Sequence, residues 1–299
     1  MIEALLKGLL TGDIKSLSRS ISIVENEATG YEELLTQLPN ASHTKVVGIT
    51  GPPGAGKSTL VNALINALLQ QGKKVAIIAV DPSSPFNFGA LLGDRIRMAQ
   101  HFNSPHVYIR SLASRGALGG LSTKIIEVTD VVKAAGFDYL FIETVGVGQS
   151  EVDIAGIADT SIVVVVPEAG DEIQTMKAGL MEIANIFVVN KSDRPTADQF
   201  VKNLRLLAHT KMRDGWETPV IKTVATQEKG IDELIAAITK HQQQNEQQQR
   251  KAYLLAEKLY QLIQHRRMKN VSKAALLADV MKHLAAGDVN VYKLAQTYA

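Results

Sequence analysis

The sequence predicts an α/β fold: a mostly parallel central sheet flanked by helices, with further helices at both ends of the chain. Three observations predict it. Between about residues 45 and 225, short β-branched runs alternate with helical stretches, which is typical of strands buried by helices on both faces. A glycine-rich segment, GPPGAGKST, joins the first strand to a helical stretch. A polar turn, NKSD, follows a later strand.

The order of these patterns predicts three parts along the chain. They are an N-terminal helical extension (1–42), a central α/β domain (43–241) and a C-terminal helical extension (242–299). The predicted strands are KVVGIT, KVAIIAV, HVYIR, DYLFIET, TSIVVVV, NIFVVN and PVIKTVA. The polar tract QQQNEQQQ opens the last part and fits either a linker or the exposed portion of a long helix.

Composition narrows the class of protein. The chain has 299 residues, of which 45% are apolar and 21% charged, as in an ordinary globular protein. A formal net charge of +2 gives no reason to expect nucleic acid or an anionic membrane as the main partner. The first twenty residues read as one amphipathic helix rather than a signal peptide, so we expect a cytoplasmic protein. The absence of Cys excludes disulfides and thiolate metal sites.

The glycine-rich segment is predicted to be a P-loop. It matches the pattern G-x-x-x-x-G-K-[ST], and it lies between a strand and a helix, as that motif requires. Its backbone N–H groups would hold phosphate at a helix N-terminus, with Lys57 reaching the β- and γ-phosphates and Ser58 ligating Mg²⁺. The predicted phosphate-binding residues are Gly51, Pro52, Pro53, Gly54, Ala55, Gly56, Lys57, Ser58 and Thr59.

The NKSD turn is predicted to bind a guanine base. The Asp193 carboxylate can accept hydrogen bonds from guanine N1–H and from the exocyclic amine, a donor pair that adenine lacks. Lys191 can lie along the base, and Asn190 can tie neighbouring loops together. The backbone of Val224, Ala225 and Thr226, after the next strand, can offer N–H groups to guanine O6. The nucleotide is therefore predicted to be GTP or GDP.

Three carboxylates are candidates for a Mg²⁺ site near the γ-phosphate. Asp81 ends the second strand, Asp94 follows it in LLGDRIRM, and Glu143 ends the strand DYLFIE. Mg²⁺ prefers oxygen ligands and retains several waters, so not every carboxylate needs to bind it directly. Asp81 and Asp94 also fit helix or turn caps. Gly146, in the segment after Glu143, would let that segment respond to the γ-phosphate.

Six motifs taken together resemble one family. GPPGAGKST, VDPSSPF, LLGDRIRM, GALGGLS, ETVGVGQSE and NKSD resemble the MeaB-like P-loop GTPases, chaperones of adenosylcobalamin-dependent acyl-CoA mutases. Some members carry the older label ArgK or LAO/AO transport-system ATPase. The resemblance covers about residues 45–240 closely and the helical ends more loosely. A Glu at the end of the third-motif strand is itself typical of this branch of GTPases.

The resemblance implies a function and a set of roles. It implies GTP hydrolysis, a homodimer joined largely through helical extensions, and docking on a methylmalonyl-CoA-type mutase to gate adenosylcobalamin loading and protection. A cobalamin adenosyltransferase is a further expected partner. Matched residue by residue, Lys57, Asp94, Glu143 and Lys177 are assigned to catalysis. Lys177 lies in EAGDEIQTMKAG, a segment that resembles a further switch loop of the family. Phe88 stands where the family usually has Gly, a departure within the first switch.

Two alternative functions remain open at the level of sequence. A nickel-delivery GTPase shares this branch of folds, but it carries metal on Cys and His, and this chain has no Cys and no clustered His. A transport-associated ATPase or kinase is the other alternative, and the NKSD turn argues against it. Nucleotide preference and nickel binding would discriminate between the three.

Overall fold

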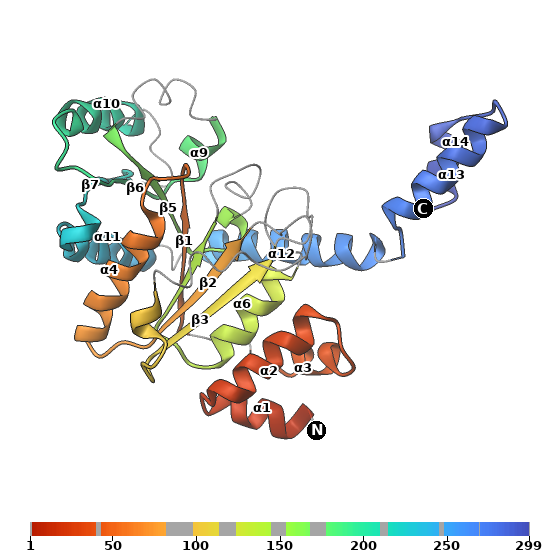
Figure 1. The fold of residues 1–299 in the computed structure, drawn as a ribbon, viewed down its shortest axis with the longest axis horizontal. Coiled ribbons are helices and arrows are strands. Elements are labelled where there is room, and N and C mark those ends of the chain that lie inside the picture. Colours follow the sequence, from red (N-terminus) through yellow and green to blue (C-terminus); the bar gives the residue numbers. More distant parts are fainter. Residues whose placement is uncertain are drawn as a thin grey trace. The chain divides into compact units, whose positions relative to one another are not determined.

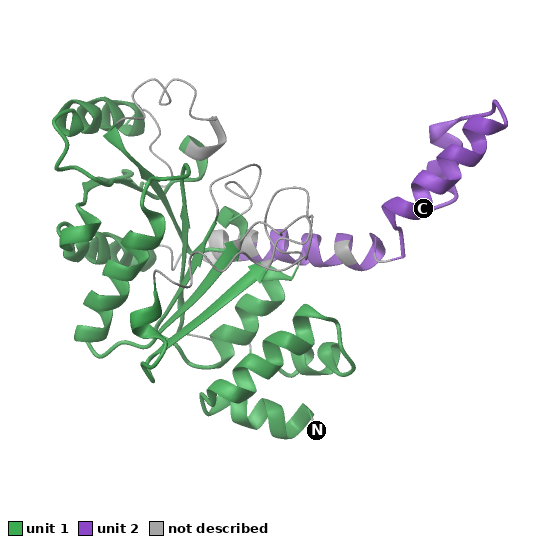
Figure 2. Cartoon of the chain, viewed as in Figure 1, with its two compact units in different colours: residues 1–251 green, residues 252–299 purple. Residues whose placement is uncertain are grey.

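The computed structural model describes residues 2–39, 43–81, 98–113, 124–144, 154–167, 178–209, 215–244, 248–268 and 270–298. The chain forms two compact units, residues 1–251 and 252–299 (Figure 2). Each unit is described by itself. The boundary between the units falls inside the C-terminal part predicted from the sequence, in a helix that begins at Gln248.

Unit 1 is built on a sheet of seven strands, and all the pairings among its described strands are parallel. Their order across the sheet is β3-β2-β4-β1-β5-β6-β7 (Figure 1). The strands are β1 (Lys45–Thr50), β2 (Val75–Asp81), β3 (Val107–Ala113), β4 (Tyr139–Glu143), β5 (Thr160–Val165), β6 (Ile186–Val189) and β7 (Val220–Lys222). Each of the seven predicted strands is present, and the predicted α/β fold is confirmed.

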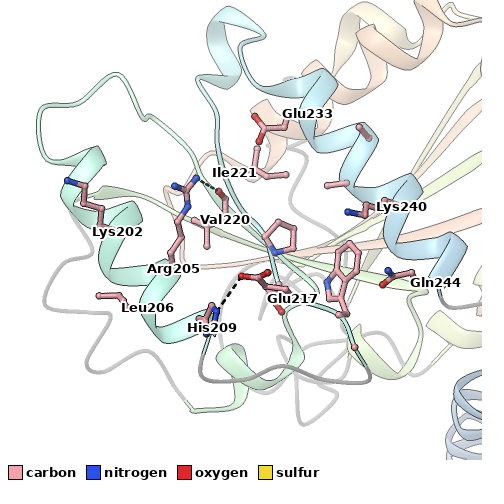
Figure 3. Close-up of a pocket in the computed structure, with 16 residues that line it drawn as sticks. Lys202, Arg205, Leu206, His209, Glu217, Val220, Ile221, Glu233, Lys240 and Gln244 are labelled. Atoms are coloured by element: carbon pink, nitrogen blue, oxygen red, sulfur yellow. Dashed lines mark hydrogen bonds and ion pairs between the residues drawn. The ribbon is translucent and has the colours of Figure 1, made fainter.

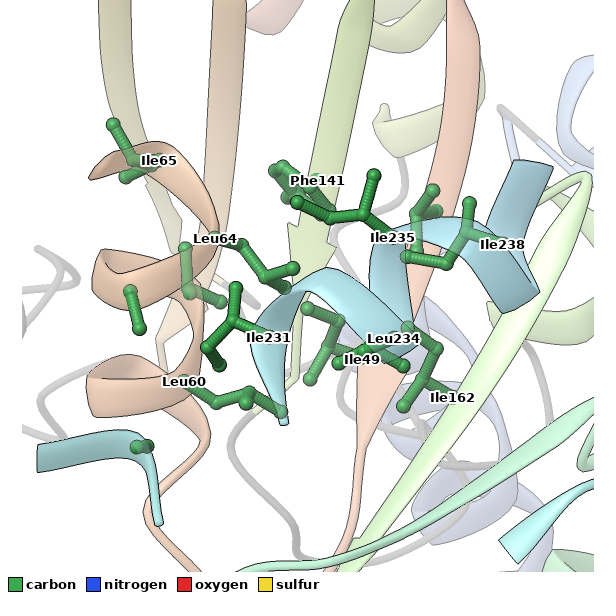
Figure 4. Close-up of a cluster of buried hydrophobic side chains, with 14 of the residues drawn as sticks. Ile49, Leu60, Leu64, Ile65, Phe141, Ile162, Ile231, Leu234, Ile235 and Ile238 are labelled. Carbon is green, nitrogen blue, oxygen red and sulfur yellow. The ribbon is translucent and has the colours of Figure 1, made fainter. Parts of the chain in front are cut away.

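Helices cover both faces of this sheet because the strand residues alternate between the two. On one face, Ile162 and Val164 of β5 belong to a core shared with α4 and α11 (Figure 4). On the other face, Val163 and Val165 pack with Phe200 and the rest of the apolar side of α10. Buried apolar side chains on both sides of one strand explain its continuous apolar sequence. The helices of this layer are α4 (Lys57–Gln70), α6 (Ile125–Ala134), α9 (Ala178–Ile183), α10 (Ala197–His209) and α11 (Ile231–Gln244), with short 3₁₀ turns at Ala99–His101, Ile154–Gly156 and Ala225–Gln227.

The N-terminal extension consists of three helices, α1 (Ile2–Leu10), α2 (Ile14–Glu25) and α3 (Tyr31–Thr36). The expectation of one amphipathic helix over the first twenty residues is therefore wrong. Gly12 adopts φ 78°, which ends the first helix, and the Asp13 side chain accepts a hydrogen bond from the N–H of Ser16 at 2.8 Å, which begins the second. Of the apolar residues that follow helical spacing in this segment, Leu10 is exposed and the others are buried: Leu5, Leu9, Leu17, Ile21 and Val24.

Ion pairs join this extension to the sheet layer. Glu25 lies 2.7 Å from Arg110 of β3, and Glu27 lies 2.7 Å from Lys124 at the start of α6. Lys124 is buried and also pairs with Glu127 at 3.0 Å. Burial alone would lower the pKa of Lys124, but the two carboxylates outweigh it and raise that pKa, so the ammonium stays charged. A buried cation with two acidic partners holds the extension in one orientation on α6.

Unit 2 contains most of α12 (Gln248–Met268), with α13 (Lys273–Ala285) and α14 (Val291–Gln296). Side chains at two N-termini cap the last two helices: Ser272 accepts from the N–H of Ala275, and Asn290 accepts from the N–H of Lys293. Neither α13 nor α14 contains a buried residue. Across the helices that the structure describes, none is long and apolar enough to cross a bilayer.

Candidate functional site

The predicted nucleotide site lies at the carboxyl edge of the sheet, where ligands bind in open α/β folds. Strands β4, β1, β5, β6 and β7 are consecutive across the sheet, so the loops that follow them are neighbours. Strand register places Glu143, the last residue of β4, beside Ile49 of β1 and Ala79 of β2. The P-loop, Glu143 and the NKSD turn therefore meet at one edge.

The P-loop backbone depends on three glycines with positive φ. Gly51, Gly54 and Gly56 have φ of 140°, 77° and 86°, values that L side chains rarely adopt. At Gly51 a Cβ would also lie only 2.0 Å from the carbonyl oxygen of Val164, so any side chain would displace the neighbouring strand β5. Lys57 begins α4 immediately after the loop. These features give the strand–loop–helix geometry that the P-loop motif requires.

Lys57 folds back over this loop. Its side chain is buried, and its Nζ donates to the carbonyl oxygens of Gly51 at 2.8 Å and Pro52 at 3.1 Å. The ammonium is thus held directly above the backbone that is expected to bind phosphate. Phosphate oxygens would compete well for it, because charge-assisted hydrogen bonds to an anion are stronger than those to a neutral carbonyl.

Ser58 and Glu143 form a buried pair. Ser58 Oγ donates to Glu143 Oε1 at 2.7 Å, and both residues are almost fully buried. Immediately beyond, Thr144 Oγ1 donates to Thr50 Oγ1 at 2.9 Å, which joins the ends of β4 and β1. A hydroxyl and a carboxylate are the hard oxygen ligands that Mg²⁺ prefers. The donor set at this position therefore fits the metal expected from the sequence.

Asn190 joins the base turn to the P-loop. Its Nδ2 donates to the carbonyl of Ala55 at 2.9 Å, and its Oδ1 accepts from Thr223 Oγ1 and from the N–H of Ala225, both at 3.1 Å. Lys191, in a left-handed conformation with φ 55°, donates from Nζ to the carbonyl of Gly54 at 2.9 Å. These hydrogen bonds join the base turn to the P-loop and to the segment after β7, as expected if Asn190 ties neighbouring loops together.

The other residues predicted to contact the base differ in how accessible they are. Asp193 is exposed at the end of the turn, accessible to a base. The N–H of Val224 donates to the carbonyl of Lys229, and that of Ala225 donates to Asn190. Those two amides already have partners in this structure, one of them 35 residues away along the chain, and motif spacing does not predict either hydrogen bond. A contact from this segment to guanine O6 stays a prediction, with Thr226 included.

Several predicted residues lie outside the part of the chain that the structure describes. These are Asp94, Gly146 and Lys177, together with Phe88 of the first switch. The backbone of Asp81 ends β2 at the same sheet edge, two residues beyond the partner of Glu143, but its side chain is not described. The roles of these residues stay predictions.

A matched pair of glycine substitutions tests the link between the two loops. Gly54 and Gly56 have similar positive φ, so alanine costs about 1–3 kcal/mol of backbone strain at either position. A Cβ at Gly56 would lie 2.4 Å from Asn190 Nδ2, whereas at Gly54 it would meet nothing within 4 Å in the described chain. We expect Gly56→Ala to weaken GTP binding about tenfold more than Gly54→Ala, since about 1.4 kcal/mol is tenfold in affinity. Fluorescent-nucleotide titration measures both, and equal losses would contradict it.

Comparison with known sequences finds relatives that cover most of this chain. The family model described as "Methylmalonyl Co-A mutase-associated GTPase MeaB" matches residues 17–278. A Pyrococcus abyssi protein named as a GTPase is 50% identical over 248 residues, covering 81% of this chain and 76% of that protein. The mouse protein named "Methylmalonic aciduria type A homolog, mitochondrial" is 34% identical over 265 residues, covering 81% of this chain and 63% of its own.

Solved structures give the same result for the fold. The crystal structure titled as an LAO/AO transport system kinase superposes with a TM-score of 0.71 and 26% sequence identity, covering 99% of this chain and 96% of that one. The family model spans the P-loop, Glu143 and the NKSD turn, the same residues that the sheet brings to one edge. The chain therefore belongs to the MeaB family of methylmalonyl-CoA mutase-associated GTPases, and it hydrolyses GTP.

Proposed function

We propose that this GTPase binds an adenosylcobalamin-dependent acyl-CoA mutase, of the methylmalonyl-CoA type or a relative, and that its nucleotide state gates cofactor loading and protection. The family description and the name of the mouse relative support a mutase as partner. A cobalamin adenosyltransferase is a second partner in the same proposal, and the proposed location is the cytoplasm. The observation that carries the proposal is the buried hydrogen bond between Ser58 and Glu143.

That hydrogen bond gives the nucleotide site a way to affect the rest of the chain. Ser58 belongs to the P-loop helix, whereas Glu143 is the last residue of β4 and the first residue of the third motif, ETVGVGQSE. A group that binds both side chains would change their mutual hydrogen bond. The position of Glu143, and of the segment that follows it, would then depend on the nucleotide. A switch must differ between its two states to bias a partner.

The residues at the sheet edge have separate roles in the proposed hydrolysis. Lys57 would move from the carbonyls of Gly51 and Pro52 to the β- and γ-phosphate oxygens, and the loop amides would hold the remaining charge. Ser58 and Glu143 would hold Mg²⁺, with Asp81 and Asp94 as further candidates. Mg²⁺ supplies neutralisation of the charge on the β- and γ-phosphates. Asn190, Lys191 and Asp193 would hold the guanine base.

The alternative of nickel delivery gains no support. Among the residues that the structure describes, no group of three or more His, Cys, Asp or Glu side chains could hold a metal ion, and the chain has no Cys.

The experiment that tests the proposed function is binding of the chain, loaded with a non-hydrolysable GTP analogue or with GDP, to the purified B12-dependent mutase of the same organism. Tighter binding in one nucleotide state supports the proposal. No binding in either state contradicts it.

We also propose that the protein is a homodimer joined through its C-terminal helices. On α12, Leu255, Leu259 and Ile263 are exposed and four residues apart, which places them on one face of the helix. On α13, Leu277 and Met281 repeat the pattern and are also exposed. Contiguous exposed apolar faces of this kind are typical of an interface. A two-fold interface between copies would bury them.

Truncation after Gln244, the end of α11, should therefore give a monomer that still binds nucleotide. The core of unit 1 does not include the deleted residues, so GTP affinity should change by less than about twofold, within the range of surface changes. Sedimentation velocity at micromolar concentration measures the change from dimer to monomer. A full-length chain that sediments as a monomer would contradict the proposed dimer, and loss of nucleotide binding would show that the last helices support the site.

A further inference from the structure

A groove lies along the edge strand β7 of unit 1. Its volume is about 1070 Å³, and it lies between α10 and α11 (Figure 3). Its floor is formed by β7 and by the residues just before it, 215–219. The groove runs along β7 from residues 215–219, which precede the strand, to Glu233 in the first turn of α11, whereas the nucleotide site lies at the carboxyl ends of the strands.

The groove is lined by apolar groups bordered by cations. Leu206 of α10 is 71% exposed, an unusual state for a leucine in a concave surface, and Ala236 and Ala237 of α11 line the opposite wall. Trp216 forms part of the floor. Trp and Arg are the residue types enriched at the centres of protein interfaces, and Trp216 and Arg205 both line this concavity beside apolar side chains.

The charged side chains that line the groove carry a net excess of one positive charge, three cations against two carboxylates. Lys202, Arg205 and Lys240 line the groove, against two carboxylates, and of these Glu217 lies 3.9 Å from His209 Nε2. Glu233 is the other acid. A partner that places carboxylates at the rim would therefore be attracted, and one with basic residues there would be repelled.

The floor of the groove is held by hydrogen bonds, so it is formed before a partner arrives. Trp216 Nε1 donates to the carbonyl of Asn185 at 2.8 Å, and its ring packs edge-on against His241 with centroids 4.9 Å apart. His241 is itself buried and shares a hydrogen bond with Thr160 Oγ1 at 2.9 Å. A preformed floor lowers the ordering cost of binding.

We do not expect a partner to bind in the groove as an additional β-strand beside β7. The edge strand β7 has only three residues, and Arg205 Nη2 lies 3.4 Å from the carbonyl oxygen of Val220, in a long hydrogen bond that occupies one of the few edge groups. A cation that covers a short edge is a feature that discourages strand addition. The occupant is therefore bound through side chains.

We infer that this groove docks a segment of the mutase that carries exposed apolar side chains flanked by carboxylates. The inference rests on the proposed function and names the surface through which it acts. The chain's own C-terminal unit is a poor occupant, because residues 252–299 contain seven Lys or Arg against three Asp or Glu. A basic segment beside Lys202, Arg205 and Lys240 would be repelled. An acidic, apolar segment complements both the charge and the apolar strip.

The test compares two double variants in binding to the purified B12-dependent mutase, with the chain loaded with a GTP analogue. Lys202→Glu with Leu206→Asp changes two exposed residues on the groove side of α10. Lys7→Glu with Leu10→Asp, also exposed, makes the same chemical change on α1. Biolayer interferometry at two salt concentrations gives the affinities. GTPase activity and sedimentation of each variant are measured alongside.

We expect the groove variant to bind the mutase at least about tenfold more weakly, as for a central interface residue, while the α1 variant stays within about twofold. Added salt should lower the affinity of the wild type more steeply than that of the groove variant. The groove variant has fewer attractive charges for the salt to screen. Basal GTP hydrolysis and the dimer should be unchanged in both.

The outcomes separate this inference from the proposed function. If the wild type binds the mutase and the groove variant binds it equally well, the groove is not the docking surface, and the proposed function stands. If the groove variant becomes monomeric, the groove is an interface between copies of this chain, and the inference is overturned. If the wild type does not bind the mutase in any nucleotide state, the proposed function fails and the docking surface fails with it.

Discussion

Glu143→Gln is expected to lower the rate of GTP hydrolysis by at least about 100-fold, the usual cost of losing one preorganised electrostatic contact. The substitution keeps the shape of the side chain and its ability to accept the hydrogen bond that Ser58 donates at 2.7 Å. It removes the negative charge at a buried position beside the P-loop helix. Since charge near the metal and the γ-phosphate is what stabilises phosphoryl transfer, hydrolysis should suffer far more than folding.

Nucleotide affinity should change much less than the rate. Phosphate binding depends mainly on the loop amides and on Lys57, which already lies over the carbonyls of Gly51 and Pro52. Steady-state GTPase assays beside a nucleotide titration measure the two quantities separately. The variant should still bind the mutase, but its hydrolysis should no longer be coupled to cofactor loading.

Glu127→Gln is the matched control for this experiment. Glu127 is also a buried glutamate, but its partner is Lys124 at 3.0 Å, at the contact between α6 and the N-terminal helices. Its loss should destabilise the protein and leave the hydrolysis rate nearly unchanged. Hydrolysis at the wild-type rate in Glu143→Gln would show that Glu143 has no role in hydrolysis. An equal loss of hydrolysis rate in both variants would indicate general destabilisation.

The fold could be predicted from the sequence because its signals are local. The strand TSIVVVV is apolar at every position from Ile162 to Val166, which is what a strand covered on both faces requires, and β5 indeed packs on both sides. The N-terminal extension was correctly predicted to be helical, but the single helix expected over its first twenty residues is divided between α1 and α2. Periodicity alone could not place the turn, which depends on φ 78° at Gly12 and on the cap that Asp13 provides.

The candidate site was predictable to the extent that it consists of motifs. The P-loop and NKSD are each contiguous, so spacing was sufficient to find them, and the parallel sheet brings them together at one edge. Asn190 was predicted to tie neighbouring loops together, but its partners, and the other hydrogen bonds that join the strand ends, could not be predicted from the sequence. The hydrogen bond from Asn190 to Ala55 joins residues 135 positions apart, and that from Thr144 to Thr50 joins residues 94 apart. The groove at β7 was missed for the same reason, because its walls come from two separate helices.

Asp193→Asn is expected to change the base specificity of the protein. The variant should bind GTP about 2–4 kcal/mol more weakly and bind xanthosine triphosphate better than the wild type does. The Asp193 carboxylate is exposed at the end of the NKSD turn, and it can accept from both N1–H and the exocyclic amine of guanine. Xanthine has an oxygen in place of that amine, so an amide that donates to the oxygen suits it and a carboxylate does not.

The surrounding turn should keep its shape in this variant. Asn190 has three hydrogen bonds to other loops, and Lys191 is tied to Gly54, so the position of the turn does not depend on Asp193. Asp198→Asn is a suitable control, because Asp198 is an exposed carboxylate on the next helix that pairs with Lys222 at 2.9 Å. That control should leave the preference for GTP unchanged.

Competition titrations with GTP, ATP and xanthosine triphosphate measure the change in all three proteins. The wild type should prefer GTP over ATP strongly, since adenine would leave the carboxylate without the donors it accepts from in guanine. Equal affinity of the wild type for GTP and ATP would show that Asp193 does not recognise the base. A loss of GTP binding in Asp193→Asn without a gain for xanthosine triphosphate would mean that the carboxylate supports the turn rather than contacting guanine. Only the reciprocal change, a loss for one base and a gain for the other, is specific to a direct contact, because a misfolded turn weakens every nucleotide alike.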